Sequence, residues 1–398
     1  MIIRSKKKKK AVSKAVTITV FVIVIVAIYL TGRLLPRNIA DAYSSEVFPL
    51  LSSFSQRISS LTRVSLTEIT VVVLGSLAVP LLIVWLVFLF KKAMTRGVGK
   101  YLYKSLRNVL AIAMVVMIIF ELMHGFNYRR TSARTLMGLG QTKLTFDDYC
   151  EALEWSYGEM IKARKELKED ANGVAQLLTD YEDTAEYASE ITDTFCASYG
   201  IAKYRCYTRP KTVRLSHYWS YTYIIGMYNP AYGEANINTD YMDITSTPST
   251  ICHELCHTKG FANETDCNLI GTLACLTSER ADFRYCGYYT VFVSLLGQIE
   301  SLKKTKGFKY EYKIKSDDIR PVARDTQAAN DYWKSIDKEV DDIQKRFGIN
   351  ITEKANEANN RFLESNGEKG GTDTYNVPEN VYVDFYLKYI CPGSSGNA

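Results

Sequence analysis

The sequence predicts a chain in two parts, an α-helical membrane anchor of three spans and a mostly helical domain of the α+β class. Two observations carry this prediction. Apolar runs dominate residues 1–130, whereas residues 131–398 are polar, rich in tyrosine and mixed in charge. Within the second part, a short β-prone stretch bounded by turn residues interrupts the helical periodicity. A chain of 398 residues has room for both parts.

Three apolar segments in the first part are candidate membrane spans, and they cover about residues 15–31, 69–90 and 109–123. Crossing a hydrocarbon core of about 30 Å takes about 20 residues, so the second segment is long enough and the others lie near the lower limit. Arg33 and Pro36 match the small-residue cleavage site of a signal peptide poorly, so we expect the first segment to remain as an anchor. The membrane region then covers residues 15–124.

Lysine and arginine gather at the N-terminus, residues 1–14, and in the loop between the second and third segments. The positive-inside rule therefore predicts a multi-pass protein of the plasma membrane with both regions in the cytoplasm. After three spans, residues 125–398 form an extracytoplasmic domain. The net charge of +6 comes mostly from the N-terminal lysine run. Because this run directly precedes an apolar span, we expect it to lie beside anionic lipid and expect no nucleic-acid partner.

The segment His253-Glu254-Leu255-Cys256-His257 predicts a metal site, although the chain has only four histidines. Histidines four residues apart share one face of a helix, so both rings can reach one tetrahedral Zn²⁺. Glu254 lies beside such a metal without having to bind it, and can act as general base toward a water that the metal acidifies. We therefore expect one zinc ion per chain, although other divalent ions suit the same ligands.

A catalytic zinc usually has three protein ligands and one open position. Gly260 offers an exit from the histidine helix, and Glu264 and Asn268 follow it four residues apart, so both can face one side of a second helix. We expect Glu264 to be the third ligand and Asn268 to orient a ligand imidazole by a hydrogen bond. Asp266 remains the alternative ligand. A thiolate of Cys252 or Cys256 is also conceivable, but these positions are offset from the histidine face and favour buried structural cysteines.

A strand just before the metal helix would complete a peptide-binding cleft. The stretch 220–227 is β-prone, the segment 235–238 reads as a short strand, and residues 248–250 begin the metal helix. An edge strand holds an extended peptide through main-chain hydrogen bonds. We expect 235–238 to be that strand, with Glu234 and Asn236 either contacting substrate or capping the turn.

Further helices are expected over residues 145–200, 322–346, 351–365 and 376–390. All nine cysteines lie in the second part, which suits an oxidising compartment, and Cys196 with Cys206 could form a disulfide. Tyrosine could donate a hydrogen bond to an oxyanion, although packing is the simpler role for each of three candidates. These are Tyr285, Tyr288 and Tyr375. We expect His217 to be structural, and Glu121 and His124 to mark only the end of the third span.

The motif differs from two known zinc-peptidase patterns. Gly260 falls where the metzincin pattern HExxHxxGxxH has its glycine, but Asn263 replaces the histidine or aspartate that follows. Glu264 and Asn268 are more similar to the ExxxD pattern of gluzincins, with asparagine in place of aspartate and a much shorter gap from His257.

A set of short segments occurs in order along nearly the whole chain. They are Ala42-Tyr43-Ser44, Phe48-Pro49-Leu50, Gly125-Phe126-Asn127-Tyr128, Tyr228-Asn229-Pro230, Gly233-Glu234-Ala235-Asn236, His253 to His257, Gly260-Phe261, Glu264, Asp266, Asn268, Gly371 and Thr374-Tyr375. The set resembles a bacterial membrane family, domain of unknown function 3810. This resemblance implies three spans followed by an extracytoplasmic HExxH domain, zincin-like and peptidase-like, of unestablished substrate.

The sequence therefore predicts a membrane-anchored zinc metallopeptidase that hydrolyses peptide bonds of cell-envelope or extracellular substrates. Its partners would be the lipid bilayer and a peptide or protein at the outer membrane surface. Two alternatives stay open: a non-catalytic zinc-containing membrane sensor or scaffold, and a zinc hydrolase of a non-peptide envelope component. An intact Glu254 argues against the first, because a structural site has no use for that carboxylate.

Overall fold

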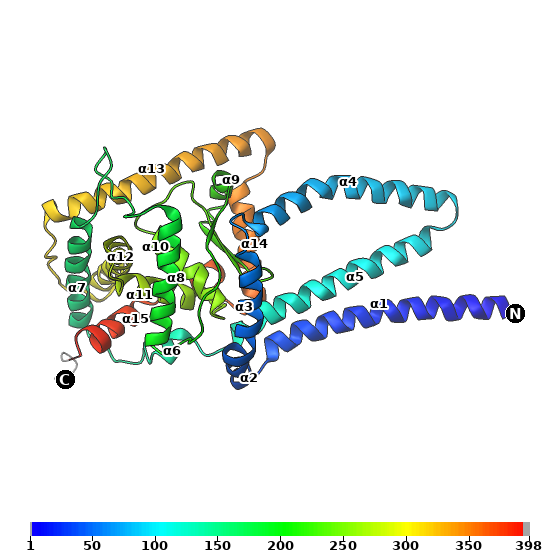
Figure 1. The fold of residues 1–398 in the computed structure, drawn as a ribbon, viewed down its shortest axis with the longest axis horizontal. Helices are drawn as coiled ribbons and strands as arrows, with labels where there is room; N and C mark the ends of the chain where they lie inside the picture. The colour runs from blue at the N-terminus through cyan, green and yellow to red at the C-terminus, as the bar shows by residue number, and fades with distance from the viewer. Residues whose placement is uncertain (1, 393–398) are drawn as a thin grey trace.

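The computed structural model describes residues 2–392, with side chains from residue 12 onward. Three long helices extend side by side from a domain that contains most of the remaining residues (Figure 1). The C-terminal end of the described chain lies at the far side of this domain from the tips of the long helices (Figure 1). The division into an apolar helical part and a mostly helical domain is therefore confirmed.

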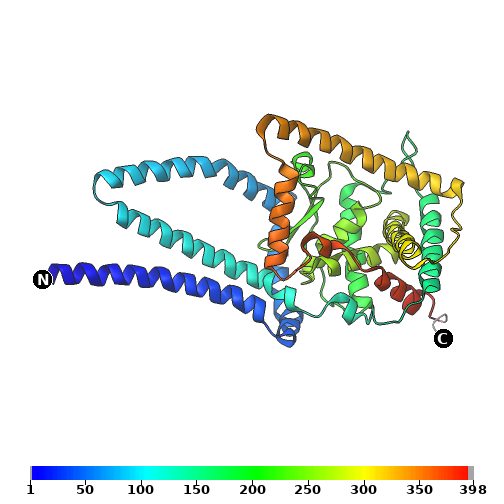
Figure 2. The ribbon, with the colours of Figure 1, turned by 180° about the vertical axis from the view of Figure 1, so that it is seen from behind.

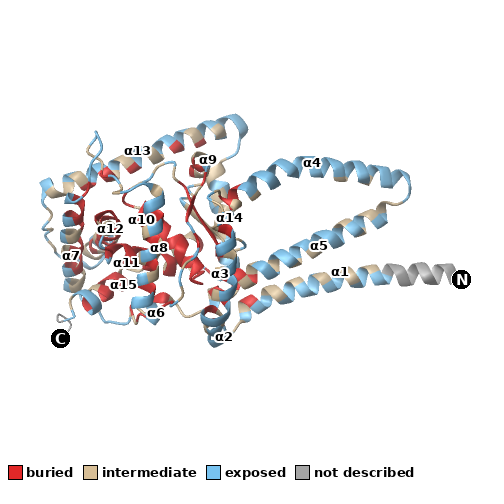
Figure 3. Ribbon diagram, in the orientation of Figure 1, coloured by how far each residue is buried: buried red, intermediate tan, exposed pale blue. Residues whose placement is uncertain are grey.

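The three long helices are α1 (Ile2–Leu34), α4 (Leu66–Met94) and α5 (Val98–Met123). Each contains a segment long and apolar enough to cross a membrane, by length and composition. Their side chains are largely exposed along the apolar length, whereas the domain has a buried interior (Figure 3). All three exceed the predicted spans because the helices continue into their polar flanks, where lysine and arginine are good helix formers. Pro80 lies inside α4.

Residues 35–65 connect α1 to α4 and contain α2 (Arg37–Ala42), a π-helical stretch (Tyr43–Val47) and α3 (Phe48–Ser59). Helix α3 runs crosswise to the long helices where they meet the domain (Figure 1). The connection ends at Ser65, whose hydroxyl accepts a hydrogen bond from the Glu68 amide (2.9 Å) and so caps the N-terminus of α4.

The domain is built on two helix pairs, α7 with α12 and α10 with α11, which share one large apolar core. The helices of the domain are α6 (Ala133–Leu136), α7 (Phe146–Lys165), α8 (Tyr181–Ser198), α9 (Ser216–Ser220), α10 (Thr247–Thr258), α11 (Glu264–Leu276), α12 (Ala281–Lys306), α13 (Ser316–Phe347), α14 (Ile351–Ser365) and α15 (Glu379–Phe385). The predicted helix over 145–200 is wrong as a single element. A turn at Asp170, whose carboxylate accepts from the Asn172 and Val174 amides, separates α7 from α8.

The sheet has three short strands, β1 (Lys211–Thr212), β2 (Gly226–Asn229) and β3 (Glu234–Ile237). Strand β3 lies in the middle, parallel to β1 and antiparallel to β2. The segment expected to be the edge strand is therefore central, and β2 is the edge that lies beside α10.

The expected disulfide between Cys196 and Cys206 is not formed. Cys196 is fully buried in the main core, whereas the thiol of Cys206 lies 3.1 Å from the Thr258 hydroxyl at the end of α10.

Candidate metal centre

Helices α10 and α11 present the candidate site between them. Helix α10 has Pro248 in its first turn, and Gly260 with φ +72° reverses the chain after its end. Helix α11 begins at the Asn263 cap, whose side chain accepts from the Asp266 amide (3.2 Å). A β-carbon on Gly271 would lie 2.9 Å from the Ser249 carbonyl oxygen, so glycine allows the two helices to approach closely.

The two histidines of the motif are oriented by hydrogen bonds at Nδ1. His253 Nδ1 lies 2.6 Å from Asn268 Oδ1, and His257 Nδ1 lies 2.8 Å from the Phe261 carbonyl oxygen. Since both acceptors fix a proton on Nδ1, both Nε2 atoms are left as lone-pair donors. This is the arrangement that metal-binding histidines adopt.

Glu264 faces both Nε2 atoms. Its Oε2 lies 3.0 Å from His253 Nε2 and 3.7 Å from His257 Nε2. Ligands of a tetrahedral zinc lie about 3.3 Å apart when the bonds are about 2.0–2.1 Å long. When both rings are neutral and carry their proton on Nδ1, neither Nε2 can donate to Oε2. This buried carboxylate oxygen is then left without a hydrogen-bond donor, which is costly unless a cation shares the space. These three side chains therefore fit a zinc ion.

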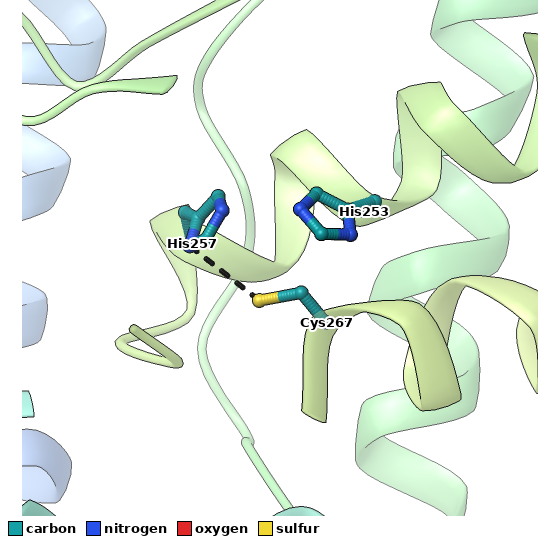
Figure 4. Close-up of side chains that lie close together, drawn as sticks. All are labelled: His253, His257 and Cys267. Carbon is teal, nitrogen blue, oxygen red and sulfur yellow. Dashed lines mark hydrogen bonds between the residues drawn. The ribbon is translucent and has the colours of Figure 1, made fainter. Parts of the chain in front are cut away.

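Cys267 is the other candidate for third ligand, because a ligand atom of each of His253, His257 and Cys267 falls within a group spanning 4.8 Å. Figure 4 shows the sulfur directed at the His257 ring. The contact is to Nδ1 (3.4 Å), and the same sulfur lies 3.4 Å from the Phe261 carbonyl oxygen. Cys267 thus lies on the Nδ1 side of His257, which is already hydrogen-bonded, and not on the Nε2 side that faces Glu264. Nothing in the sequence pattern distinguishes this thiol from the other cysteines.

Asp266 and Asn268, the other two residues of α11 that the sequence predicted for the site, have different partners in the structure. The Asp266 carboxylate accepts from the Ala133 amide (2.9 Å) and so caps α6, and burial raises its pKa to about 7. Asn268 holds His253 and donates from Nδ2 to the Tyr375 carbonyl oxygen (2.6 Å). Asn268 is therefore in place to orient a ligand, whereas Asp266 serves another helix.

Glu254 lies at one end of a cavity of about 410 Å³ between β2, α10 and α14. Burial raises the pKa of Glu254 to about 8 against the opposing charge of His253. Helix α14 crosses the face of the domain from which the long helices leave (Figure 2). The cavity lining includes Gly226, His253, Glu254, Asn268, Asn359 and Tyr375. A buried carboxylate with a pKa near neutral, open to a cavity of ligand size, is suited to proton transfer.

Glu234 and Asn236, predicted beside a substrate-binding edge, have other partners. Glu234 is fully buried, pairs with Lys211 Nζ (2.7 Å) and accepts from the Leu66 and Thr67 amides at the start of α4. Asn236 Oδ1 accepts from the Ser65 hydroxyl (2.6 Å). A carboxylate at a helix N-terminus is favourable because of the helix dipole. Both residues therefore attach α4 to the sheet, and the interpretation as a substrate edge is wrong because β3 is central.

Three aromatic side chains lie near the proposed metal ligands, where the sequence predicted no role for His124 or Tyr228 and favoured packing for Tyr375. His124, just after α5, lies with its ring centroid 5.6 Å from that of His257, and Tyr228 stacks on His257 at 5.5 Å and lies 6.0 Å from His124. Tyr375 stacks 6.1 Å from His253. The apolar pattern of α5 gives no reason to connect His124 with the metal-binding motif. Only the folded chain brings the end of this candidate span beside His257.

The other candidates lie away from the site. Tyr285 donates to Asp325 (2.7 Å) in the core, and Tyr288 packs against Trp155 at 5.3 Å. His217 lies between Asp240 (2.8 Å) and Glu339 (3.0 Å), where it links α9 to α13.

The chain belongs to the family described as Protein of unknown function (DUF3810), whose match covers residues 43–378. The family resemblance drawn from the sequence is therefore confirmed. No curated protein and no solved structure matches the chain.

Proposed function

We propose that the protein is a membrane-anchored, zincin-like metallopeptidase with one zinc ion held by His253, His257 and Glu264. The observation that carries this proposal is the convergence of two Nε2 atoms on Glu264 Oε2, which is buried without a hydrogen-bond partner. When bound, zinc supplies Lewis acidity, which polarises a substrate carbonyl and lowers the pKa of a bound water to about 7. In the proposed orientation the domain lies outside the cell and its substrates are peptides or proteins of the envelope.

The chain's own residues supply the remaining chemistry. Glu254, whose free-site pKa burial raises to about 8, takes a proton from the attacking water and delivers it to the leaving amine. Asn268 and the Phe261 carbonyl hold the two imidazoles in orientation. The edge of β2 beside Glu254 is available to pair with an extended peptide, and Tyr375 borders the same cavity.

The test uses the full chain in lipid nanodiscs, with zinc content and cleavage of a peptide library measured for wild type, Glu254→Gln and His253→Ala. We expect about one zinc per chain in wild type and Glu254→Gln, and loss of zinc in His253→Ala. Cleavage should fall about 10²–10⁴-fold in Glu254→Gln, as expected for loss of a general base. Cleavage that persists in Glu254→Gln would contradict the proposal.

A second function, a zinc-containing membrane sensor, is favoured by one observation. The site is tied to the spans through His124 at the end of α5, and through Arg33 of α1, which donates to Asn366 Oδ1 (2.5 Å) just after α14. Retained zinc without cleavage of any peptide would support this function or hydrolysis of a non-peptide envelope component.

A further inference from the structure

Helix α3 buries a mostly polar face and exposes an apolar one, the reverse of what a helix on the surface of a water-soluble domain does. After Phe48, which is buried at its first position, the buried face of α3 is polar and carries Ser52, Gln56 and Ser59. Leu50 is 72% exposed and Phe54 68% exposed on the opposite face. The exposed apolar residues at helical spacing in and beside α3 are Val47, Leu50, Leu51, Phe54, Ile58 and Leu61. A surface helix in water normally buries such a stripe, so this stripe requires an apolar surrounding.

The position of α3 identifies that surrounding. Residues 35–65 connect the ends of two candidate spans, so α3 is held where the membrane ends. It runs crosswise to α1, α4 and α5 where they meet the domain, and exposed residues alternate with buried ones along it (Figure 3). The turn between α13 and α14 lies on the same side of the domain and carries two further exposed apolar residues, Phe347 and Ile349.

We propose that α3 is an in-plane membrane helix, whose apolar face lies at the boundary between headgroups and acyl chains of the leaflet nearest the domain. Interfacial helices of this kind bury one face about 5–10 Å into that boundary. The charge of Arg57 is compatible with this position, because its guanidinium lies over the Tyr207 ring of the domain (3.8 Å) and not on the apolar face of α3. The occupant of the apolar face is lipid, because the flanking spans are themselves exposed to lipid.

The polar face of α3 attaches this membrane helix to the end of the metal helix. Ser52 Oγ donates to the Thr258 carbonyl oxygen (3.3 Å), and Gln56 Nε2 lies 3.5 Å from the same oxygen. Gln56 also accepts from the amides of Tyr207 (2.7 Å) and Thr208 (3.1 Å). A β-carbon on Gly260 would lie 3.0 Å from the Phe48 ring, so the turn after α10 is pressed on the start of α3.

The segment after the third span makes the same connection. Arg130 donates to the carbonyl oxygens of Lys259 (3.0 Å) and Gly260 (2.9 Å), directly after the last turn of α10. The carbonyl oxygens of Thr258, Lys259 and Gly260, at and just after the C-terminus of α10, thus accept hydrogen bonds from α3 and from the segment that follows α5. His257 precedes Thr258, so the candidate metal centre is held next to the lipid surface. This placement does not depend on whether the site is catalytic.

The experiment places a photo-crosslinking phenylalanine analogue, p-benzoyl-phenylalanine, at single positions of the full chain in native membranes. Leu50 and Phe54 test the face of α3. Leu82 of α4, which is 54% exposed, is the lipid-facing control, and Val293 of α12, which is 46% exposed, is the control in the body of the domain. We expect phospholipid adducts at positions 50, 54 and 82 and none at 293. Adducts to a second copy of the chain, or none at 50 and 54 while 82 reacts, would overturn the proposal.

A second measurement compares two matched charge substitutions in nanodiscs. Phe54→Asp and Val293→Asp each place a carboxylate at an exposed apolar helix position. In water the two changes should be equally mild, whereas a carboxylate in the lipid boundary is destabilising. We expect a clear lowering of Tm for Phe54→Asp and little change for Val293→Asp. Equal Tm values for the two variants would contradict the embedding of α3.

Discussion

Gly226 of β2 lies directly against the carboxylate of Glu254 of α10. A β-carbon at position 226 would lie 2.3 Å from Glu254 Oε1 and 2.9 Å from its carboxyl carbon. The edge strand therefore sets the position of the proposed general base, and any side chain at 226 must displace it. Only the absence of a side chain allows the strand and the carboxylate to share the same wall of the cavity.

This contact predicts the effect of Gly226→Ala. Displacement of a catalytic group by about 1 Å can lower a rate about 10²-fold, so cleavage should fall by that order. The zinc content should not change, because the three atoms nearest to the added β-carbon all belong to Glu254, which is not a proposed ligand. Gly297→Ala is the matched control, since nothing lies within 4 Å of the β-carbon it would add. An active Gly226→Ala enzyme would show that Glu254 is not positioned by β2.

The third ligand is tested by comparing Glu264→Ala with Cys267→Ala. Glu264 faces the two Nε2 atoms, whereas Cys267 contacts Nδ1 of His257. Zinc measured after dialysis should be lost from Glu264→Ala and retained by Cys267→Ala. Asp266→Asn should also retain zinc, because Asp266 caps α6. If Glu264→Ala kept its zinc and Cys267→Ala lost it, the third ligand would be Cys267 and not Glu264.

Glu234→Gln tests the attachment of α4 to the sheet. The side chains of Lys211 and Glu234 are 1% and 0% exposed, so the substitution leaves a buried ammonium with only the carbonyl oxygens of Ser59 and Val64 and no opposite charge. Such a loss lowers the free energy of unfolding by about 3–5 kcal/mol. Thermal unfolding in nanodiscs should show the loss, and Lys211→Met combined with Glu234→Gln should recover part of it. Unchanged stability of Glu234→Gln would contradict the role of this ion pair in attaching α4 to the sheet.

The contacts of His217 with Asp240 and Glu339 predict that the interaction between α9 and α13 depends on pH. Hydrogen bonds to Asp240 and Glu339 raise the pKa of His217 above its ordinary value. Because the folded-state pKa is the higher one, the link is at full strength below the unfolded pKa of about 6.5 and is lost as pH rises through the raised value. The difference in Tm between wild type and His217→Gln should therefore be larger at about pH 6 than at about pH 9. A constant difference would show that the charge on His217 contributes nothing.

The features that follow from local pattern could be predicted from the sequence. Apolar length identified the three candidate spans, and the spacing of His253 and His257 placed both rings on one helix face. Glu264 and Asn268 could be placed near them because they lie four residues apart on the next helix, close after Gly260. Each of these inferences needs only the geometry of one helix or one turn.

The features that depend on distant parts of the chain could not be predicted. The strand order places β3 in the centre of the sheet, whereas the sequence predicted an edge strand. Glu234 therefore lies at the N-terminus of α4 and not in a substrate cleft. His124 lies beside His257 only because α5 ends against the domain. A turn at Asp170 divided one predicted helix into two, because its side chain offers the backbone alternative hydrogen bonds.

The central claim is that one zinc ion is held by two imidazoles and one carboxylate. Zinc X-ray absorption spectroscopy of the purified full chain in nanodiscs tests it most directly. The claim predicts stoichiometric zinc with nitrogen and oxygen ligands at about 2.0–2.2 Å, including two imidazoles, and no sulfur ligand. A sulfur ligand at about 2.3 Å, or well-folded protein without stoichiometric zinc, would contradict it.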